Sequence, residues 1–332
     1  MTVGEAIFGG AWTLPGSGGR VDAAPAGADR RRGAPAPAPA PDTTASAGQD
    51  VAVVDAWTRP VRLVLTVLTV LALGVCFYLV LGSGIEHTAA QSSAMAQFND
   101  ELSQGTAPIR PTTAGGALLP AGTPIALLEI PALGVREVVG EGTTSAALIR
   151  GPGHERSTVF PGGTGTSVLM GRAAAFGGPF GRLADLRPGA VITVVTGVGT
   201  STFRVVDVRT AGQLIPPLTA GEARLTLATA AGSPFFPSGV VWVDADATTP
   251  ALAAARPPMA TVPADELPLG SSPGAYWGVL LWLLVLVGVL AAAAWTWRRR
   301  GHAQAWIIFV APLLVIGYSI TGEVARVLPN LT

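Results

Sequence analysis

Three long apolar runs and one stretch of short alternating runs divide the 332-residue chain. The apolar runs cover residues 61–82, 275–297 and 305–322, and each approaches the ~20 residues that cross the hydrocarbon core of a bilayer. The third run is a little short and contains Pro312, which a helix bundle inside a membrane tolerates. The pattern therefore predicts three transmembrane helices.

Arginines beside these runs predict how the helices are oriented. Arg59 and Arg62 stand at the start of the first run, and three consecutive arginines open the short turn 298–304 between the second and third runs. Cytoplasmic flanks of membrane helices carry an excess of positive residues. We therefore expect a multi-pass plasma-membrane protein with a cytoplasmic N-terminus, and with residues 83–274 and 323–332 on the extracytoplasmic side.

Composition distinguishes the segments between these runs. Residues 1–58 are rich in Ala, Pro and Gly, and such a segment buries too little apolar surface to offset its ordering entropy. We expect a disordered cytoplasmic tail there. Residues 83–124 and 248–274 contain many small residues and prolines, and they are expected to be extracytoplasmic linkers on either side of one domain.

That domain, residues 125–247, carries about seven short β-rich runs separated by Gly and Pro. The runs are 125–130, 133–139, 166–171, 190–196, 202–210, 224–229 and 240–245. Several alternate with a period of two, as half-buried strands do. Only 143–149 and 179–186 suit short helices. So many strands in about 120 residues predict a mainly β domain, a closed or nearly closed β-barrel of about seven to eight strands.

Composition also excludes several kinds of site. The net charge is zero, so nothing indicates a nucleic-acid partner. The single cysteine, Cys76, rules out a disulfide within the chain and a cysteine-ligated metal site. His87, His154 and His302 are scattered, so a histidine metal cluster is not expected, and neither is a cofactor.

Within the β domain, motifs in a fixed order resemble those of the sortase family. The first two are "LEIPALGVREVVGEGTTSAALIRGPGH" at 128–154 and "FPGGTGTSVLMGRAAAFGGPFGRLADLRPGAVITV" at 160–194. They are followed by "RLTLATAAG" at 224–232 and "SGVVWVDA" at 238–245. The resemblance implies a sortase-like β-barrel in a membrane-anchored protein. It also implies transpeptidase chemistry with a cysteine nucleophile, a histidine that handles the proton and an arginine that stabilises the oxyanion.

The chain departs from the family pattern at all three catalytic positions. Carried over motif by motif, the histidine position holds Arg172, the cysteine position holds Ala230, and the arginine position falls on or beside Gly239. Cys76 lies within the first apolar run and cannot reach an outer site. The resemblance with these departures predicts a protein in which cysteine chemistry does not run.

Other residues near the predicted cleft leave an alternative open. His154, Thr229, Ser233 and Ser238 are candidates for an enzyme with non-cysteine chemistry, in which a hydroxyl is activated by His154 as base. A packing or loop role for His154 is the favoured interpretation, and Arg172 is either a carboxylate-binding fork or an ordinary surface side chain.

Three functions are consistent with the sequence. The favoured one is a catalytically inactive sortase-like protein that binds peptide or surface-protein partners at the cell envelope. The second is an active transpeptidase or hydrolase with altered chemistry. The third is a subunit of a membrane complex with the barrel as a cap, in which Gly278, Gly288 and Gly317 permit close helix packing. The expected partners are the lipid bilayer, a peptide or cell-surface protein, and for the third function another membrane protein.

Overall fold

The computed structural model describes residues 58, 62, 65–113, 115–210, 212–233, 235–253, 259, 261–272, 274–300 and 302–332. The chain divides into two units, Met1–Arg59 and Pro60–Thr332. The tail predicted for residues 1–58 lies outside the described residues except for Thr58. Every element below belongs to the second unit.

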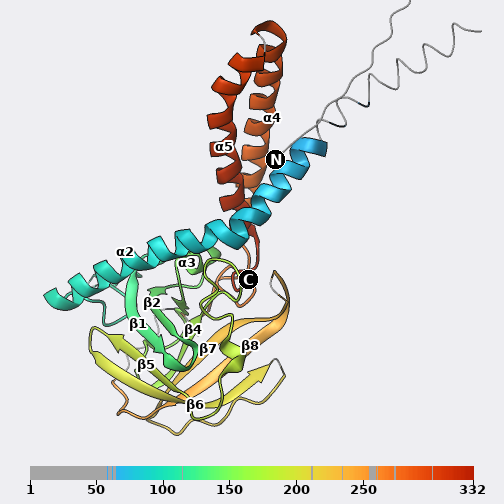
Figure 1. The fold of residues 1–332 in the computed structure, drawn as a ribbon. Helices are drawn as coiled ribbons and strands as arrows, with labels where there is room; N and C mark the ends of the chain where they lie inside the picture. Colours follow the sequence, from blue (N-terminus) through green and yellow to red (C-terminus); the bar gives the residue numbers. More distant parts are fainter. Residues whose placement is uncertain are drawn as a thin grey trace, which may run out of the picture. The chain divides into compact units, whose positions relative to one another are not determined.

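Eight strands form a closed barrel (Figure 1), in the order β1-β2-β3-β4-β7-β8-β6-β5. They are β1 (Pro124–Ile130), β2 (Val135–Glu141), β3 (Gly153–His154), β4 (Gly165–Met170), β5 (Val191–Thr196), β6 (Gly199–Thr210), β7 (Ala223–Ser233) and β8 (Phe236–Ala247). Neighbours are antiparallel except β2 with β3 and β4 with β7, which are parallel. The predicted closed β-barrel is confirmed. The strand absent from the sequence pattern is β3, whose two residues are too few to show an alternation.

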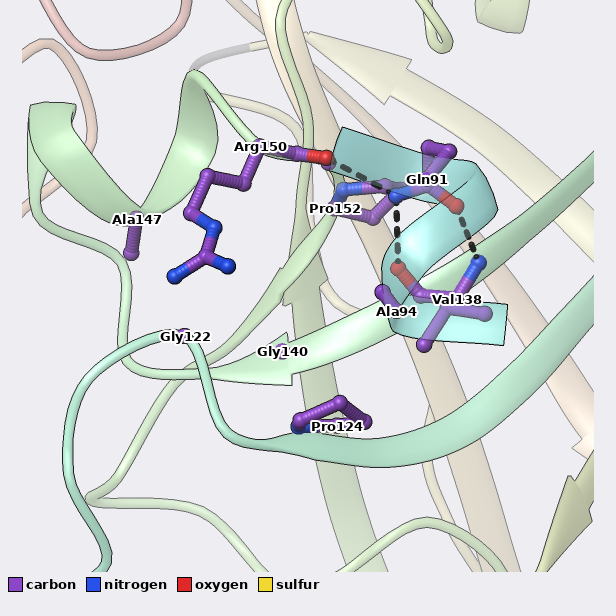
Figure 2. A pocket seen from close by; sticks show the side chains of 10 residues that line it. Gln91, Ala94, Gly122, Pro124, Val138, Gly140, Ala147, Arg150 and Pro152 are labelled. Carbon is purple, nitrogen blue, oxygen red and sulfur yellow. Dashed lines mark hydrogen bonds between the residues drawn. The ribbon is translucent and has the colours of Figure 1, made fainter. Parts of the chain in front are cut away.

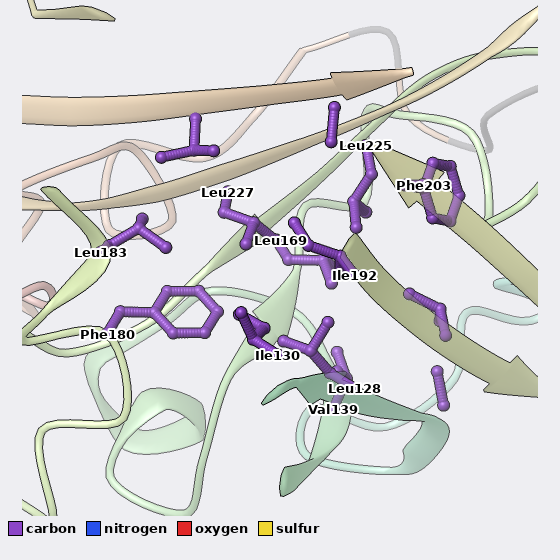
Figure 3. Packing of buried hydrophobic residues seen from close by; sticks show 14 of the residues in the cluster. Leu128, Ile130, Val139, Leu169, Phe180, Leu183, Ile192, Phe203, Leu225 and Leu227 are labelled. Carbon is purple, nitrogen blue, oxygen red and sulfur yellow. The ribbon is translucent and has the colours of Figure 1, made fainter. Parts of the chain in front are cut away.

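The barrel interior is filled by aliphatic and aromatic side chains (Figure 3). Along β5, Ile192 and Val194 are buried while Val191 is exposed, which is the alternation expected of a strand with one face inward. Phe203 and Val205 of β6 likewise point into this cluster. Each such side chain contributes roughly 1.5–3 kcal/mol through its removal from water, so the barrel is held by a packed core.

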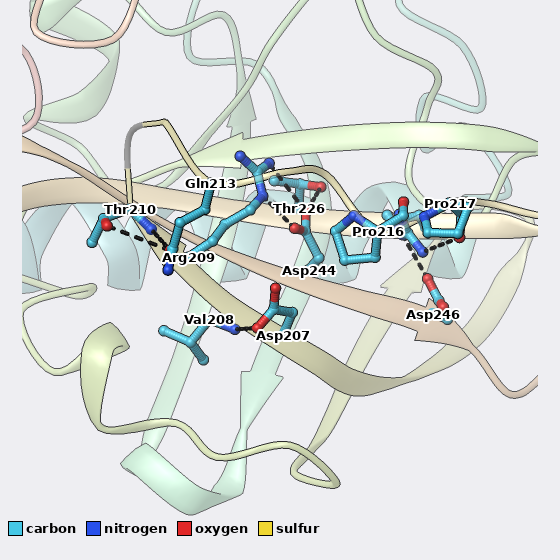
Figure 4. Close-up of polar contacts among 11 residues, drawn as sticks. Asp207, Val208, Arg209, Thr210, Gln213, Pro216, Pro217, Thr226, Asp244 and Asp246 are labelled. Atoms are coloured by element: carbon cyan, nitrogen blue, oxygen red, sulfur yellow. Dashed lines mark hydrogen bonds and ion pairs between the residues drawn. The ribbon is translucent and has the colours of Figure 1, made fainter.

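Two buried charge groups fasten the strands on the β6–β8 side (Figure 4). Arg209 of β6 pairs with Asp244 of β8, which also accepts a hydrogen bond from Thr226 of β7 at 2.7 Å. Arg224 of β7 pairs with Asp246 of β8 at 2.6 Å. Since breaking a buried ion pair by removing one partner costs about 3–5 kcal/mol, we assign Arg209, whose partner Asp244 is fully buried, to the stability of the barrel.

The short helical segments follow the sequence pattern closely. The run 143–149 contains α3 (Ser145–Leu148), whose N-cap Thr144 accepts a hydrogen bond from the amide of Ala147 at 3.3 Å. The run 179–186 contains a 3-10 turn, η3 (Leu183–Asp185). A second 3-10 turn, η2 (Pro131–Leu133), joins β1 to β2.

The segment expected to be the linker 83–124 is helical over its first half, as α2 (Ser83–Gln104). Its sequence is rich in Ala, Ser, Gln and Glu and contains neither Pro nor an interior Gly after residue 84, and Gly105 ends it at a φ of 67°. Phe98 is fully buried and packs with Leu127 and Val138 of the barrel. The expectation of a linker rested on the Pro- and Gly-rich residues 106–124, and it missed the helix before them.

Among the described residues, three helices are long and apolar enough to cross a membrane: Leu65–Gln104, Ala275–Arg299 and Ile307–Val327. The first has 40 residues and is about 60 Å long, which exceeds the ~30 Å of a hydrocarbon core. A π-helical turn, η1 (Tyr78–Gly82), stands before its polar half α2. The apolar half therefore suits the membrane, and α2 suits the barrel surface.

The last two helices, α4 (Ala275–Arg300) and α5 (His302–Val327), pack against each other. Gly278 permits one close approach, because a Cβ there would lie 2.8 Å from the carboxylate of Glu323. Gly288 and Gly317 have no atom within 4 Å of such a Cβ, so they do not mediate packing between the described helices.

Candidate functional site

The three residues expected at the family's catalytic positions lie next to β4 (Arg172), in β7 (Ala230) and in β8 (Gly239). The parallel pair β4 and β7 keeps one constant offset up to Met170 opposite Ala228. Arg172 follows the end of β4 by two residues, and Ala230 lies two residues beyond Ala228 in β7. In the next pair, β7 with β8, Ala230 faces Val240 and Ala231 faces Gly239.

Arg172 is fully buried rather than exposed at the surface. Its Nη1 donates to the main-chain oxygen of Thr332 at 2.7 Å, and its Nη2 donates to the Oγ and main-chain oxygen of Ser145 at 2.8 and 3.2 Å. The guanidinium carbon lies 5.1 Å from the ring centroid of Phe176. Burial lowers the pKa of Arg172 to about 10, so the side chain carries its charge at neutral pH and stabilises main-chain oxygens.

Residues 328–332, which follow α5, fill the space beside these positions. Leu331 is fully buried and belongs to a cluster with Leu148, Met170, Ala228 and Val240, against which Ala230 also packs. We call the surface formed by these residues of the barrel, with Ser145 and Arg172, the Arg172 site. At Gly239, in contrast, an added Cβ would meet no atom within 4 Å.

Segment 328–332 is also held through its main chain and through Asn330. The amide of Ala173 donates to the oxygen of Leu331 at 2.8 Å, and the amide of Asn330 donates to the oxygen of Gly270 at 2.8 Å. The Asn330 side-chain Nδ2 donates to the oxygens of Thr143 at 2.8 Å and Leu267 at 3.0 Å. The expected extracytoplasmic tail 323–332 is therefore partly helix, to Val327, and partly bound to the barrel.

The predicted linker 248–274 contributes to the same region. Thr143 donates through Oγ1 to the main-chain oxygen of Glu266 at 2.7 Å. The Glu266 side chain lies 3.4 Å from Arg156 Nη1. Burial raises the pKa of the Glu266 carboxyl, and the charge of Arg156 opposes this shift. Residues 261–272 thus pack against the barrel and segment 328–332, where we expected a linker.

His154 is held in the barrel wall by its own partners. Its Nδ1 lies 3.0 Å from Glu141 Oε2, and its Nε2 lies 2.9 Å from the oxygen of Val159 and 3.2 Å from Thr158 Oγ1. The ring is fully buried and meets Phe160 edge-on, with 5.8 Å between centroids. Both ring nitrogens are engaged, which is the arrangement of a packing histidine.

The three hydroxyl candidates donate to main-chain oxygens instead of meeting a base. Thr229 is buried and its Oγ1 donates to Gly171 at 2.9 Å. Ser233 and Ser238 lie in the β7–β8 hairpin and donate to the oxygens of Phe236 and Ala231 at 3.3 and 3.4 Å. Thr229 therefore contacts the residue that precedes Arg172. None of the three hydroxyls forms a hydrogen bond with His154.

A separate cavity lies between α2 and the barrel (Figure 2). Gln91 crosses it and bonds the main chain of Val138 and the oxygen of Arg150. The volume of this cavity is about 20 Å³, which is room for one water molecule. Over the described ranges, no three His, Cys, Asp or Glu side chains gather as metal ligands would.

Sequence reasoning missed Ser145, Phe176 and segment 328–332 as parts of this region. Ser145 was visible only as part of a short helix. The one available signal for the segment was its composition, because Leu328 and Leu331 flank Pro329 and Asn330 without any charge directly after the third apolar run.

Comparisons with known proteins point to one family. A family model for the sortase domain matches residues 128–236. Similar solved structures include a sortase D5 transpeptidase of Clostridium perfringens (18% identity, 48% of this chain and 99% of that chain, TM-score 0.41). Another is sortase C-1 of Actinomyces oris (26% identity, 38% of this chain and 75% of that chain, TM-score 0.34). A third is sortase E of Streptomyces avermitilis (25% identity, 40% of this chain and 91% of that chain, TM-score 0.35). No curated protein matches the sequence.

Proposed function

Because this chain carries a domain of the sortase family at residues 128–236, we propose that it is a membrane-anchored, extracytoplasmic sortase-like protein without transpeptidase activity. In this proposal the barrel binds peptide or surface-protein partners at the cell envelope. The single observation that carries it is the side chain at the nucleophile position, the methyl group of Ala230.

The chemistry of acyl transfer explains why that position decides the matter. A thiolate must attack the peptide carbonyl, and a neighbouring base and an oxyanion donor must support it. Ala230 has no reactive atom, and Gly239 has no side chain to donate a hydrogen bond. Arg172 is a permanent donor at neutral pH and cannot serve as a general base. Removing a nucleophile and its base normally costs several orders of magnitude in rate.

The contacts of the remaining candidates argue against an enzyme with altered chemistry. A serine or threonine nucleophile needs a base within hydrogen-bond reach. Thr229, Ser233 and Ser238 donate to main-chain oxygens. Within the part of the chain that the structure describes, His154 meets a hydroxyl only at Thr158, which itself donates to the oxygen of Glu155 at 2.7 Å. These pairs support a structural role for the four candidates.

Contacts of segment 328–332 support the proposed membrane topology. The barrel precedes α4 and the segment follows α5, yet the two are joined by hydrogen bonds at Arg172 and Asn330. Two crossings of the membrane, one by α4 and one by α5, return the chain to the side it left. We propose that this side is extracytoplasmic and that the arginine turn 298–304 is cytoplasmic, following the positive-inside bias.

A turnover assay tests the proposal on the full chain in detergent or nanodiscs. A fluorescent sorting-signal peptide and an amine acceptor are incubated with the wild-type protein, and we expect no cleavage or transfer above the rate without protein. A matched variant, Ala230→Cys with Arg172→His and Gly239→Arg, reports whether the catalytic side chains alone were missing. Transfer by the wild-type protein would refute the proposal, whatever the variant does.

A further inference from the structure

We propose that the Arg172 site is a peptide-binding site and that segment 328–332 is its ligand in cis. A partner peptide then binds by displacing this segment. This inference rests on the proposed function, in which the barrel binds a peptide partner. It adds where the peptide binds and which segment occupies the site when no partner is bound.

The segment is bound as peptides are usually bound, through successive main-chain groups. Asn330 donates its amide to Gly270, Leu331 accepts from the amide of Ala173, and Thr332 accepts from Arg172. Main-chain pairing of this kind gives affinity with little dependence on sequence. A charged donor such as Arg172 forms a stronger hydrogen bond than a neutral one.

Two side chains supply selectivity. Leu331 enters the apolar cluster of the site, in which it is fully buried. The side-chain amide of Asn330 donates to two main-chain oxygens, while its own Oδ1 has no hydrogen-bond partner among the described residues. The site therefore favours a peptide with a polar amide followed by a branched aliphatic residue.

The barrel does not depend on the segment for its own core. Leu331 is absent from the cluster that fills the barrel, and it belongs to a smaller one at the barrel end. The ring of strands β1 to β8 is closed without residues 328–332. Leu328 makes the last helical hydrogen bond, to Val324, and Pro329 ends the helix. The segment can therefore leave the site while the strands stay paired.

The site is also in contact with the apolar helices. Ser145, which accepts from Arg172, donates through its Oγ to the oxygen of Ala325 in α5 at 3.3 Å. The Phe176 ring beneath Arg172 meets Tyr78 of η1 edge-on, and the Phe176 amide donates to Ser83. Release of the segment therefore involves the end of α5 directly.

Peptide binding to the full chain tests the inference. The probe is a fluorescent peptide of residues 324–332 with an amidated end, and a matched control peptide carries Asn330→Ala and Leu331→Ser. The same two substitutions in the protein weaken the binding of its own segment 328–332 and leave the residues of the Arg172 site unchanged. Because a site occupied in cis shows reduced apparent affinity, we expect the variant protein to bind the probe about 5- to 30-fold more tightly than the wild type.

The outcomes separate this inference from the proposed function. Tighter binding that is lost with the control peptide, and lost when Arg172→Ala is added to the variant, supports a peptide site occupied in cis. Equal or absent binding by the variant, with amide exchange of the β-strands unchanged, would overturn the inference and leave the lack of transpeptidase activity standing. Probe that stays attached after denaturation would instead refute the proposed inactivity.

Discussion

Replacing Leu331 with alanine measures how strongly segment 328–332 is held. Full burial of the leucine contributes about 2–3 kcal/mol. Four neutral hydrogen bonds, three of Asn330 and one of the Leu331 oxygen, add about 1 kcal/mol each, and the charged bond from Arg172 adds about 2 kcal/mol. Ordering five residues opposes this by about 7 kcal/mol. The segment is therefore held by a net free energy of about 1–2 kcal/mol.

This small net value limits what the substitution can cost. A buried Leu→Ala change in a fixed core costs about 2–5 kcal/mol. Leu331 differs because the whole segment can leave the site, so the loss of stability cannot exceed the net free energy that holds it. We expect Leu331→Ala to cost about 1–2 kcal/mol, and Asn330→Ala in the same chain to add nothing, a clear departure from additivity.

Hydrogen exchange and thermal unfolding of the full chain provide the assay. The Ala173 amide, which donates to the Leu331 oxygen, should exchange about 5- to 30-fold faster in Leu331→Ala, because about 1.4 kcal/mol corresponds to a factor of ten. Leu214→Ala is the control, because this leucine is 92% exposed. If Leu331→Ala lowers the free energy of unfolding by about 4–5 kcal/mol, and Asn330→Ala lowers it further, the segment is part of a fixed core. Unchanged exchange at Ala173 would show that it does not bind there.

Three further predictions concern neighbouring residues. Arg172→Ala should release segment 328–332, so that the amides of the segment lose their protection from hydrogen exchange. Arg172→Lys should restore only part of this protection, since an ammonium cannot form the planar fork of hydrogen bonds. Full protection in Arg172→Lys would contradict the geometry. Gly153→Ala should destabilise the barrel by several kcal/mol in chemical unfolding, because its Cβ would lie 2.2 Å from the oxygen of Gly142; a neutral effect would contradict the close approach. Burial raises the pKa of Glu266, so the folded state holds the proton more tightly than the unfolded state. Stability should then fall as pH rises from the ordinary carboxyl pKa through the raised one, and Glu266→Gln should abolish this slope; an unchanged slope would refute the assignment.

The barrel could be predicted because its strands obey local rules. Alternation with a period of two in several runs indicated strands, and Gly and Pro marked the turns between them. The order of motifs then indicated the family. The strand β3 escaped, since Gly153 and His154 are too few to form a pattern and pair only through tertiary contacts.

The contents of the site could not be predicted in the same way. The departures at Arg172, Ala230 and Gly239 are visible in the sequence. The burial of Arg172 depends on Thr332, which is 160 residues away in the chain. Neither periodicity nor composition carries such long-range information, so the segment that fills the site emerged only from the structure.

The mass of the intact protein tests the central claim most directly. The full chain is incubated with a sorting-signal peptide without an amine acceptor, so that any acyl-enzyme would accumulate, and is then measured by mass spectrometry under denaturing conditions. We expect an unchanged mass, because Ala230 offers no atom to acylate. An increase equal to the acyl part of the peptide would contradict it.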